Sequence, residues 1–181
     1  MAMTPGIFGG RFDPPHLGHL ALARAAVEQL GIHELEISVV AAAAHKPSIA
    51  PAADRLAMAE LTFAELDATV SLEAHAYTVD ALEARRGDDD PIFLLGADEL
   101  ADFSAWKQPE RVLELARLGV AQRPGYPTAE ASERVLVFDL EPHGISSSDI
   151  RERIRRGEPI DSLVVPAVAA YISDNGLYGR E

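Results

Sequence analysis

The sequence predicts an α/β fold in which a parallel sheet is covered by helices on both faces. Short apolar segments rich in Ile, Val, Leu and Phe alternate along the chain with longer segments that have helical apolar spacing. Gly, Pro and Asn residues punctuate these segments, and no internal repeat, low-complexity tract or long linker separates them. With 181 residues, the chain has the length of one globular domain, and we expect residues 1–181 to form a single domain.

The first half of the chain alternates strands and helices. Residues 6–8 predict a short buried strand that ends in Gly9 and Gly10, and residues 17–30 predict a helix that stops at Gly31. The next elements are expected, in order, as a strand over residues 34–42, a helix over 54–66, a short strand over 70–73 and a helix over 79–86 closed by Gly87.

The second half continues the same alternation. A Pro-Ile-Phe-Leu-Leu strand is expected over residues 91–95, followed by a helix over 109–117 with Pro109 in its first turn, where a missing N–H costs least. Strands over 118–121 and 134–140 come next, and helices over 147–156 and 166–173 close the chain, stopped by Gly157 and by Asn175-Gly176. Strands alternating with helices indicate parallel pairing, and ligands in such sheets bind beyond the carboxyl ends of the strands.

Charge and composition exclude some classes of function. The formal net charge is −13, whereas a protein that grips DNA or RNA has a basic face, so we expect no nucleic-acid partner. No apolar run approaches the roughly 20 residues of a membrane-spanning helix, so we expect no membrane partner. The first six residues lack signal-peptide features, and together with the absence of cysteine this favours a cytoplasmic location. The sequence leaves open whether the chain forms a homo-oligomer.

The most specific motif joins the first strand to the first helix. Residues 9–19 read Gly-Gly-Arg-Phe-Asp-Pro-Pro-His-Leu-Gly-His, and glycines there allow backbone amides to approach an anion closely. Because His16 and His19 are three residues apart at a helix start, their rings can converge on one phosphate and stabilise charge in a transition state. The alternatives are a surface pair of histidines and a partial metal site, for which the chain has no thiol ligand.

This motif resembles the His-x-Gly-His signature of a nucleotidyltransferase superfamily, and nearly the whole chain resembles bacterial nicotinate-nucleotide adenylyltransferases. The resemblance implies a Rossmann-like fold, a single nucleotidyltransferase domain, and an enzyme of NAD biosynthesis. In such an enzyme the phosphate of nicotinic acid mononucleotide attacks the α-phosphorus of ATP, giving deamido-NAD and pyrophosphate. The resemblance implies Mg²⁺ held mainly by the ATP phosphates rather than by a protein metal site. It implies His16 and His19 as catalytic residues, and as ATP- and phosphate-binding residues it implies Gly9, Gly10, Arg11, Phe12 and Asp13.

A second phosphate site is expected over residues 145–151, which read Ile-Ser-Ser-Ser-Asp-Ile-Arg. Hydroxyls and N–H groups at a helix start favour an anion, and Arg151 can add a bidentate contact. The alternative is an ordinary cap by Ser147 or Ser148. The segment resembles the family's Ile-Ser-Ser-Thr-x-Ile-Arg motif, which implies that Ser146, Ser147, Ser148 and Arg151 hold the β- and γ-phosphates of ATP. Arg123, in an Arg-Pro-Gly-Tyr stretch that also resembles the family, is a further phosphate-binding candidate.

Several residues are candidates for binding the acceptor. Lys46 belongs to a His-Lys pair that the family shares, which implies a catalytic contact with phosphate; the alternative is a solvated loop lysine. Tyr77 and Thr78 resemble part of the family's Ser-Tyr-Thr-Val-Asp stretch, although Thr78 could equally cap the next helix. Asp98 suits recognition of a hydroxyl or could cap a helix over residues 99–103. Trp106 could stack on a pyridine ring, as the family's aromatic residue does, or belong to the core.

Some positions depart from the family pattern. Arg11 stands where relatives have Thr or Ser, and its guanidinium could strengthen phosphate binding or obstruct the usual pose. Residues 41–44 are all alanine, and residues 72–76 lack an Arg-Gly-Gly segment and carry Ala76 in place of serine. Arg55 matches the family pattern, with an ion pair as the alternative role. The departures keep two alternatives open: an adenylyltransferase for another phosphorylated acceptor, such as nicotinamide mononucleotide or phosphopantetheine, or a nucleotide-binding regulatory protein without turnover.

Overall fold

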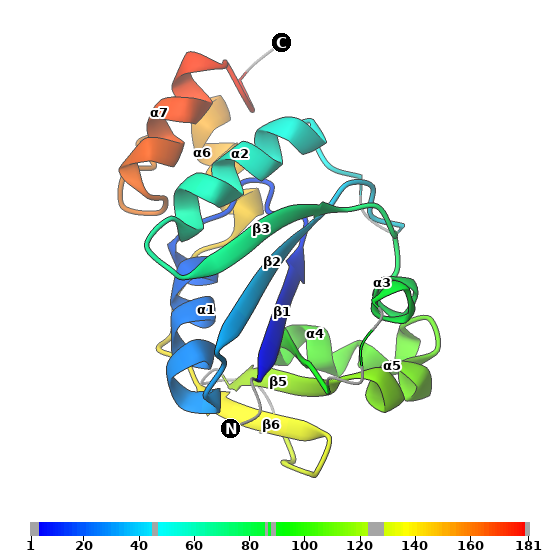
Figure 1. The fold of residues 1–181 in the computed structure, drawn as a ribbon. Coiled ribbons are helices and arrows are strands. Elements are labelled where there is room, and N and C mark those ends of the chain that lie inside the picture. The colour runs from blue at the N-terminus through cyan, green and yellow to red at the C-terminus, as the bar shows by residue number, and fades with distance from the viewer. Residues whose placement is uncertain (1–3, 45–46, 86, 88–89, 123–128, 180–181) are drawn as a thin grey trace.

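Six parallel strands form one sheet in the order β3-β2-β1-β4-β5-β6 (Figure 1). The structure is a computed structural model that describes residues 4–44, 47–85, 87, 90–122 and 129–179. The strands are β1 (Pro5–Gly10), β2 (Glu34–Val40), β3 (Ala68–Glu73), β4 (Ile92–Gly96), β5 (Arg117–Gln122) and β6 (Val135–Asp139). Each neighbouring pair in this order runs parallel, which confirms the predicted sheet.

The strand order reverses direction at the centre of the sheet. From β1 the chain builds outward through β2 to β3, and it then returns to the other side of β1 to add β4, β5 and β6. Loops that leave neighbouring strands toward opposite sides open a crevice at such a switch point, at the carboxyl ends of the strands. The fold therefore places a ligand site beyond the ends of β1 and β4.

Helices cover both faces of the sheet, as the sequence predicts. In Figure 1, α1 and α2 lie on one side of the sheet, and α3, α4 and α5 lie on the other. Two clusters of buried apolar side chains correspond to these two layers, one packed around Leu22 and Ile37 and the other around Val79 and Val112. The helices on these faces are α1 (Leu17–Leu30), α2 (Ala52–Phe63), α3 (Thr78–Ala84), α4 (Ala97–Ala101) and α5 (Pro109–Leu115), with a short 3₁₀ helix, η1 (Phe103–Ala105).

The C-terminal helices α6 (Ser147–Arg156) and α7 (Pro166–Asp174) pack with α2 (Figure 1). This third cluster buries Met58 from α2, Ile150 from α6, and Val168 and Ile172 from α7. It brings the end of the chain back toward the loop that follows β1, where Tyr178 is buried. Across the described parts of the chain, no helix combines the length and the apolar character needed to cross a membrane.

Several predicted boundaries are wrong, although every predicted element exists. The helix predicted over residues 109–117 ends at Leu115, because Ala116 is extended and Arg117 already pairs with Ile92 in the sheet. The helix predicted over 54–66 runs from Ala52 to Phe63. The helix predicted over 79–86 runs from Thr78 to Ala84, because Arg85 is already extended. The strand predicted to reach residue 42 ends at Val40, where the last pairing with β3 occurs.

Candidate active site

A cleft of about 630 Å³ opens at the carboxyl edge of the sheet and brings most of the predicted site residues together. Arg151 stands behind its lining, against the loop after β1. Lys46 and Arg123 lie outside the described residues. The predicted residues that line the cleft are Gly9, Gly10, Arg11, Phe12, Asp13, His16, His19, Tyr77, Thr78, Asp98, Trp106, Ser146, Ser147 and Ser148.

The two histidines form a stacked pair at the start of α1. His16 is the N-cap, and its backbone N–H donates to Nδ1 of His19 over 3.2 Å, while the backbone N–H of His19 donates to Nδ1 of His16 over 3.4 Å. The ring centroids are 3.7 Å apart. Because each Nδ1 accepts a hydrogen bond, the proton of a neutral ring lies on Nε2, which makes this nitrogen a donor. Donors at a helix N-terminus suit the stabilisation of phosphate charge.

Gly9 and Gly10 both line the cleft, and neither uses a backbone conformation that is open only to glycine. Neither has a positive φ. A Cβ atom at Gly9 would lie 3.1 Å from the ring of Phe93, and one at Gly10 would lie 3.0 Å from the ring of Phe12. The glycines therefore make room for two aromatic rings, Phe12 and Phe93, which also line the cleft.

The side chains of Phe12 and Asp13 serve the shape of the loop. The ring of Phe12 is 2% exposed and packs edge-on against Phe8 and Phe63. The buried carboxylate of Asp13 accepts hydrogen bonds from the backbone of Ile49 at 2.7 Å, from the backbone of Ala50 at 3.1 Å, and from the Tyr178 hydroxyl at 2.8 Å. Because both side chains have other partners, the predicted phosphate contact of Phe12 and Asp13 is assigned to their backbone groups, and it stays a prediction.

The buried guanidinium of Arg55 fastens the loop after β1 to the end of β2. Its Nη1 donates to the carbonyls of Arg11 at 2.7 Å and Val40 at 2.8 Å, and Nη2 donates to the carbonyl of Ala41 at 2.8 Å. Nε donates to the carbonyl of Ala50 at 3.1 Å. Burial lowers the pKa of Arg55, and the nearby charge of Asp13 opposes that shift. All of these hydrogen bonds go to backbone carbonyls. Arg55 therefore holds the ends of β1 and β2 together, which differs from the ion-pair role considered for it.

Arg11 points along the rim of the cleft. Its Nη1 donates to the carbonyl of Pro47 at 3.1 Å, and the residue lines the cleft beside the histidines. The guanidinium is therefore held near the expected phosphates, and its contribution to phosphate binding stays a prediction.

The start of α6 is joined directly to the loop after β1. Ser146, not Ser147 or Ser148, is the N-cap, and its hydroxyl accepts from the backbone N–H of Asp149 at 3.1 Å. The hydroxyl of Ser147 donates to the carbonyl of Pro14 at 2.8 Å. Arg151 donates to the carbonyl of Asp13 at 2.7 Å and to the hydroxyl of Ser148 at 3.1 Å. Two segments more than 130 residues apart thus form one wall of the cleft.

The opposite wall carries the residues predicted to receive the acceptor. Thr78 is the first residue of α3, and Tyr77 is the N-cap, which excludes the capping role for Thr78. The helix after β4 begins at Ala97 rather than residue 99. The carboxylate of Glu99, not that of Asp98, completes the cap by accepting a hydrogen bond from the backbone N–H of Gly96 at 3.0 Å. Trp106 lines the cleft and also packs edge-on against Phe93, so both of its expected roles fit.

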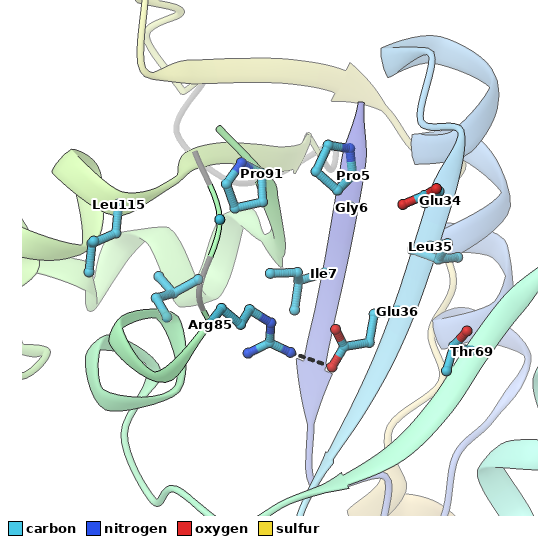
Figure 2. A pocket seen from close by; sticks show the side chains of 12 residues that line it. Pro5, Gly6, Ile7, Glu34, Leu35, Glu36, Thr69, Arg85, Pro91 and Leu115 are labelled. Atoms are coloured by element: carbon cyan, nitrogen blue, oxygen red, sulfur yellow. Dashed lines mark hydrogen bonds and ion pairs between the residues drawn. The ribbon is translucent and has the colours of Figure 1, made fainter. Parts of the chain in front are cut away.

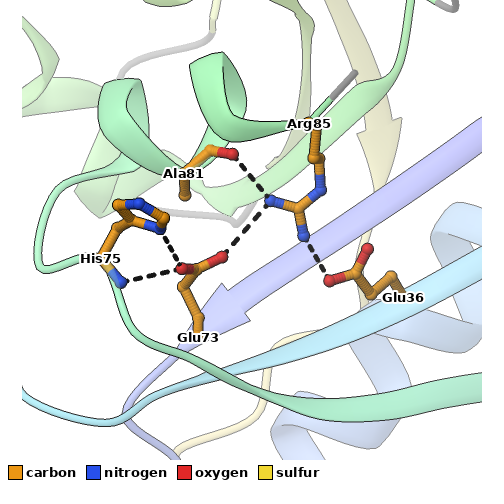
Figure 3. A network of polar contacts seen from close by, with 5 residues as sticks. All are labelled: Glu36, Glu73, His75, Ala81 and Arg85. Atoms are coloured by element: carbon orange, nitrogen blue, oxygen red, sulfur yellow. Dashed lines mark hydrogen bonds and ion pairs between the residues drawn. The ribbon is translucent and has the colours of Figure 1, made fainter. Parts of the chain in front are cut away.

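A second cavity of about 430 Å³ lies near the amino ends of β1 and β2 and shares three lining residues with the cleft: Ile7, Leu82 and Arg85 (Figure 2). Between the two spaces, the Arg85 guanidinium pairs with Glu36 on β2 and with Glu73 at the end of β3, and Glu73 also binds His75 (Figure 3). Glu73 and His75 line the cleft, and neither was predicted from the sequence as a site residue. A carboxylate that ends a strand of this sheet, followed two positions later by a histidine, was the available signal.

Within the described residues, no group of three or more His, Cys, Asp or Glu side chains is arranged to hold a metal ion.

Comparison with known proteins identifies the family of this chain. Residues 7–153 match the cytidylyltransferase-like family. A protein of Thermus thermophilus is 43% identical over 185 residues, which cover 97% of this chain and 100% of the relative, and a protein of Bordetella petrii is 36% identical over 193 residues, covering 96% and 97%. Both relatives carry the name "Probable nicotinate-nucleotide adenylyltransferase".

Solved structures share the fold at much lower sequence identity. A Plasmodium falciparum nicotinic acid mononucleotide adenylyltransferase complexed with NaAD superimposes with a TM-score of 0.85, covers 98% of each chain and is 18% identical. The fold, the His-x-Gly-His motif at the switch point and the full-length similarity to its relatives agree with one another. The chain belongs to the nicotinate-nucleotide adenylyltransferase family, within the cytidylyltransferase-like family of proteins.

Proposed function

We propose that the protein is an enzyme that transfers the adenylyl group of ATP to nicotinic acid mononucleotide and so makes deamido-NAD for NAD biosynthesis. The full-length similarity to relatives of that name supports this activity. The observation that carries it is the cleft itself, where the stacked histidines directly follow the loop after β1 and the start of α6 is hydrogen-bonded to that same loop. Two elements suited to phosphate thus face one space at the sheet's switch point.

The reaction needs positioning and charge stabilisation more than proton transfer. An oxygen of the acceptor's phosphate attacks the α-phosphorus of ATP, the bond from that phosphorus to the bridging oxygen breaks, and pyrophosphate leaves. A phosphate monoester is already anionic near neutral pH, so the attacking group needs no general base. The Nε2–H donors of His16 and His19 stabilise charge on the phosphate oxygens as it develops. Mg²⁺ arrives as part of the Mg–ATP substrate, bound mainly by phosphate oxygens.

The start of α6 is suited to binding the β- and γ-phosphates of ATP, which leave as pyrophosphate. Ser146 caps the first turn of the helix, and Ser146, Ser147 and Ser148 all line the cleft. Arg151 supports that turn from behind through Asp13 and Ser148. We propose that this segment binds the β- and γ-phosphates, with Arg123 as a further contact, and lowers the free energy of the pyrophosphate leaving group.

The acceptor is proposed to occupy the wall formed by Tyr77, Thr78, Asp98 and Trp106, with Lys46 on its phosphate. The Trp106 ring packs at right angles to the Phe93 ring and lines the cleft. A ring held in this way is suited to stacking on a pyridine ring. The net charge of −13 supports small phosphorylated metabolites rather than nucleic acid as partners. The lack of cysteine is in keeping with a cytoplasmic location, which we propose as well.

Product analysis tests this function. Purified protein is incubated with Mg–ATP and nicotinic acid mononucleotide, with nicotinamide mononucleotide and phosphopantetheine in parallel reactions, and pyrophosphate and dinucleotide are measured by chromatography. We expect deamido-NAD to form fastest. A faster reaction with another acceptor would reassign the substrate, and ATP binding without any product would indicate a regulatory protein.

The histidines provide a sharper test of the mechanism. His19→Ala and His16→Ala remove the proposed donors, so each should lower kcat by about 100-fold or more. The free energy of unfolding should change much less for His19→Ala than for His16→Ala, since His16 is also the buried cap of α1. Near-wild-type kcat in both folded variants would contradict the mechanism. His33→Ala, a substitution in the turn after α1, is the matched control.

A further inference from the structure

The segment that connects β3 to α3 is exposed at its start, although it forms part of the acceptor wall. Residues 74–76 are exposed, and His75, Ala76, Tyr77 and Thr78 all line the cleft. A segment of this kind must be ordered before it can bind a ligand with a fixed shape, and the cost of ordering it lowers affinity. The side chain that orders it is therefore important for acceptor binding.

Glu73, the last residue of β3, makes the contacts that order this segment (Figure 3). Its Oε1 accepts from the backbone N–H of His75 at 2.8 Å and lies 2.7 Å from Nδ1 of the His75 ring. The Glu73 side chain is only 13% exposed. Burial raises the pKa of Glu73, but the hydrogen bonds from His75 and the charge of Arg85 outweigh burial and lower the pKa below its usual value. At neutral pH the group is thus a carboxylate, which only accepts, and Nδ1 of His75 carries the proton.

Arg85 fixes the position of Glu73. Its Nη1 lies 3.5 Å from Oε2 of Glu73 and donates to the carbonyl of Ala81 in α3 at 3.2 Å. Its Nη2 pairs with Glu36 on β2. One guanidinium therefore ties together β2, the end of β3 and the end of α3. Only an arginine has a planar fork that reaches several acceptors on different elements at once.

The second cavity explains why the pair with Glu36 matters. Arg85 and Glu36 both line this cavity of about 430 Å³ (Figure 2), whereas of these two residues only Arg85 also lines the cleft. Without Glu36, the guanidinium has space to turn into that cavity and away from Glu73. The Glu36 carboxylate holds it at the boundary between the two spaces.

We infer that Glu73 is a positioning residue for the acceptor, and that Arg85 and Glu36 hold it in place. The inference rests on the proposed function for the identity of the acceptor. Glu73 and its partners keep residues 74–78 in the shape that receives the mononucleotide. The ATP side of the cleft is built on the loop after β1 and the start of α6, neither of which contacts Glu73 through the hydrogen bonds described above. Loss of the Glu73 carboxylate should therefore weaken binding of the acceptor and leave binding of ATP unchanged.

The first experiment measures amide hydrogen exchange and needs no assumption about the acceptor. The Glu73→Gln substitution removes the negative charge that attracts Arg85. Backbone amides of residues 74–78 should therefore exchange about tenfold faster than in wild type. Arg85→Met should act in the same direction, and Glu36→Gln should act more weakly. Glu83→Gln is the matched control, because Glu83 lies on α3, pairs with Arg111 and lines neither cavity. Unchanged exchange in Glu73→Gln would overturn the inference.

The second experiment separates positioning from general damage. With nicotinic acid mononucleotide as acceptor, Glu73→Gln should raise KM for the acceptor about tenfold, while kcat and KM for ATP stay within about twofold of wild type. Arg85→Lys, which keeps the charge but not the fork, should fall between wild type and Arg85→Met. An unchanged acceptor KM, or equal losses for both substrates, would also overturn the inference. If wild-type protein makes no dinucleotide, the proposed function fails, while hydrogen exchange still decides whether Glu73 orders the segment.

Discussion

At the scale of single residues, Gly18 illustrates how the motif depends on a missing side chain. The residue lies in the first turn of α1, between the two histidines. A Cβ atom there would lie 3.0 Å from Nδ1 and 3.1 Å from Cε1 of the His16 ring. The ring is buried and stacked on His19, so it has little room to withdraw. The glycine of the His-x-Gly-His motif is therefore needed for the position of His16 rather than for backbone freedom.

Gly18→Ala should separate activity from stability. Alanine favours a helix over glycine by about 1 kcal/mol, which offsets much of the steric cost, so the free energy of unfolding should change little. Displacement of the His16 ring by a few tenths of an ångström should lower kcat by about tenfold. Steady-state kinetics and urea unfolding measure the two effects. Gly144→Ala, where a Cβ atom meets nothing within 4 Å, is the control, and equal kcat in both variants would contradict the argument.

At the scale of elements, α6 shows two kinds of hydrogen bond at its first turn. Ser146 caps the helix itself, whereas Ser147 joins the helix to the carbonyl of Pro14 in the loop after β1. The first bond would exist in any capped helix. The second requires that a segment 133 residues away in the sequence lie beside the helix. The serine-rich motif thus combines a local role with a tertiary one.

Substitutions at the two ends of α6 should distinguish these roles. Ser147→Ala removes the bond to Pro14 and should cost roughly 1 kcal/mol of stability. Gly157→Ala places a Cβ atom on the C-cap, where φ is 72°, and should cost a similar amount of about 1 kcal/mol. Only Ser147→Ala should also raise KM for ATP, because only that end of the helix adjoins the cleft. A comparable rise in both variants would mean that helix stability alone controls ATP binding.

At the scale of the whole molecule, Tyr178 connects the end of the chain to its beginning. Its hydroxyl donates to the buried carboxylate of Asp13 at 2.8 Å, and the same carboxylate orders the backbone of residues 49 and 50. Burial raises the pKa of Tyr178, and the hydrogen bond to Asp13 raises it further. The segment after α7 is therefore coupled to the loop that leads into the His-x-Gly-His motif.

Tyr178→Phe should lower the free energy of unfolding by about 1–3 kcal/mol, because the Asp13 carboxylate loses a buried donor. The folded pKa of Tyr178 lies above its unfolded value near 10, so the folded state holds the proton more tightly. The stability that the hydroxyl contributes is constant below pH 10 and falls as the pH rises above it. Urea unfolding between pH 7 and 11 should show the gap between wild type and variant narrowing at the alkaline end. Tyr171→Phe, whose hydroxyl contacts Asp54, is the control.

The local patterns of the sequence were sufficient for the order and type of the elements. Apolar periodicity, the stops at Gly31 and Gly157, and Pro109 in a first turn act within a few residues of chain, and the structure confirms them. The end of α5 at Leu115 was not predicted correctly, because pairing of Arg117 with the neighbouring strand, and not the local sequence, decides where the helix ends and the strand begins. The motifs over residues 9–19 and 145–151 were each predicted as a phosphate site, and the structure brings residues of both to one cleft at the carboxyl edge of the sheet.

Tertiary structure alone decided which atoms each site residue uses. The sequence named Asp13, Arg55 and Ser147, but only the folded chain shows that Asp13 accepts from Tyr178, that Arg55 joins two strand ends, and that Ser147 binds Pro14. The same is true of Glu73 and Arg85, which stand 12 residues apart and meet only because β3 and α3 lie beside each other. The physical reason is that a buried polar group must find its partner in space, and that partner is set by packing between distant segments rather than by the residues beside it in the chain.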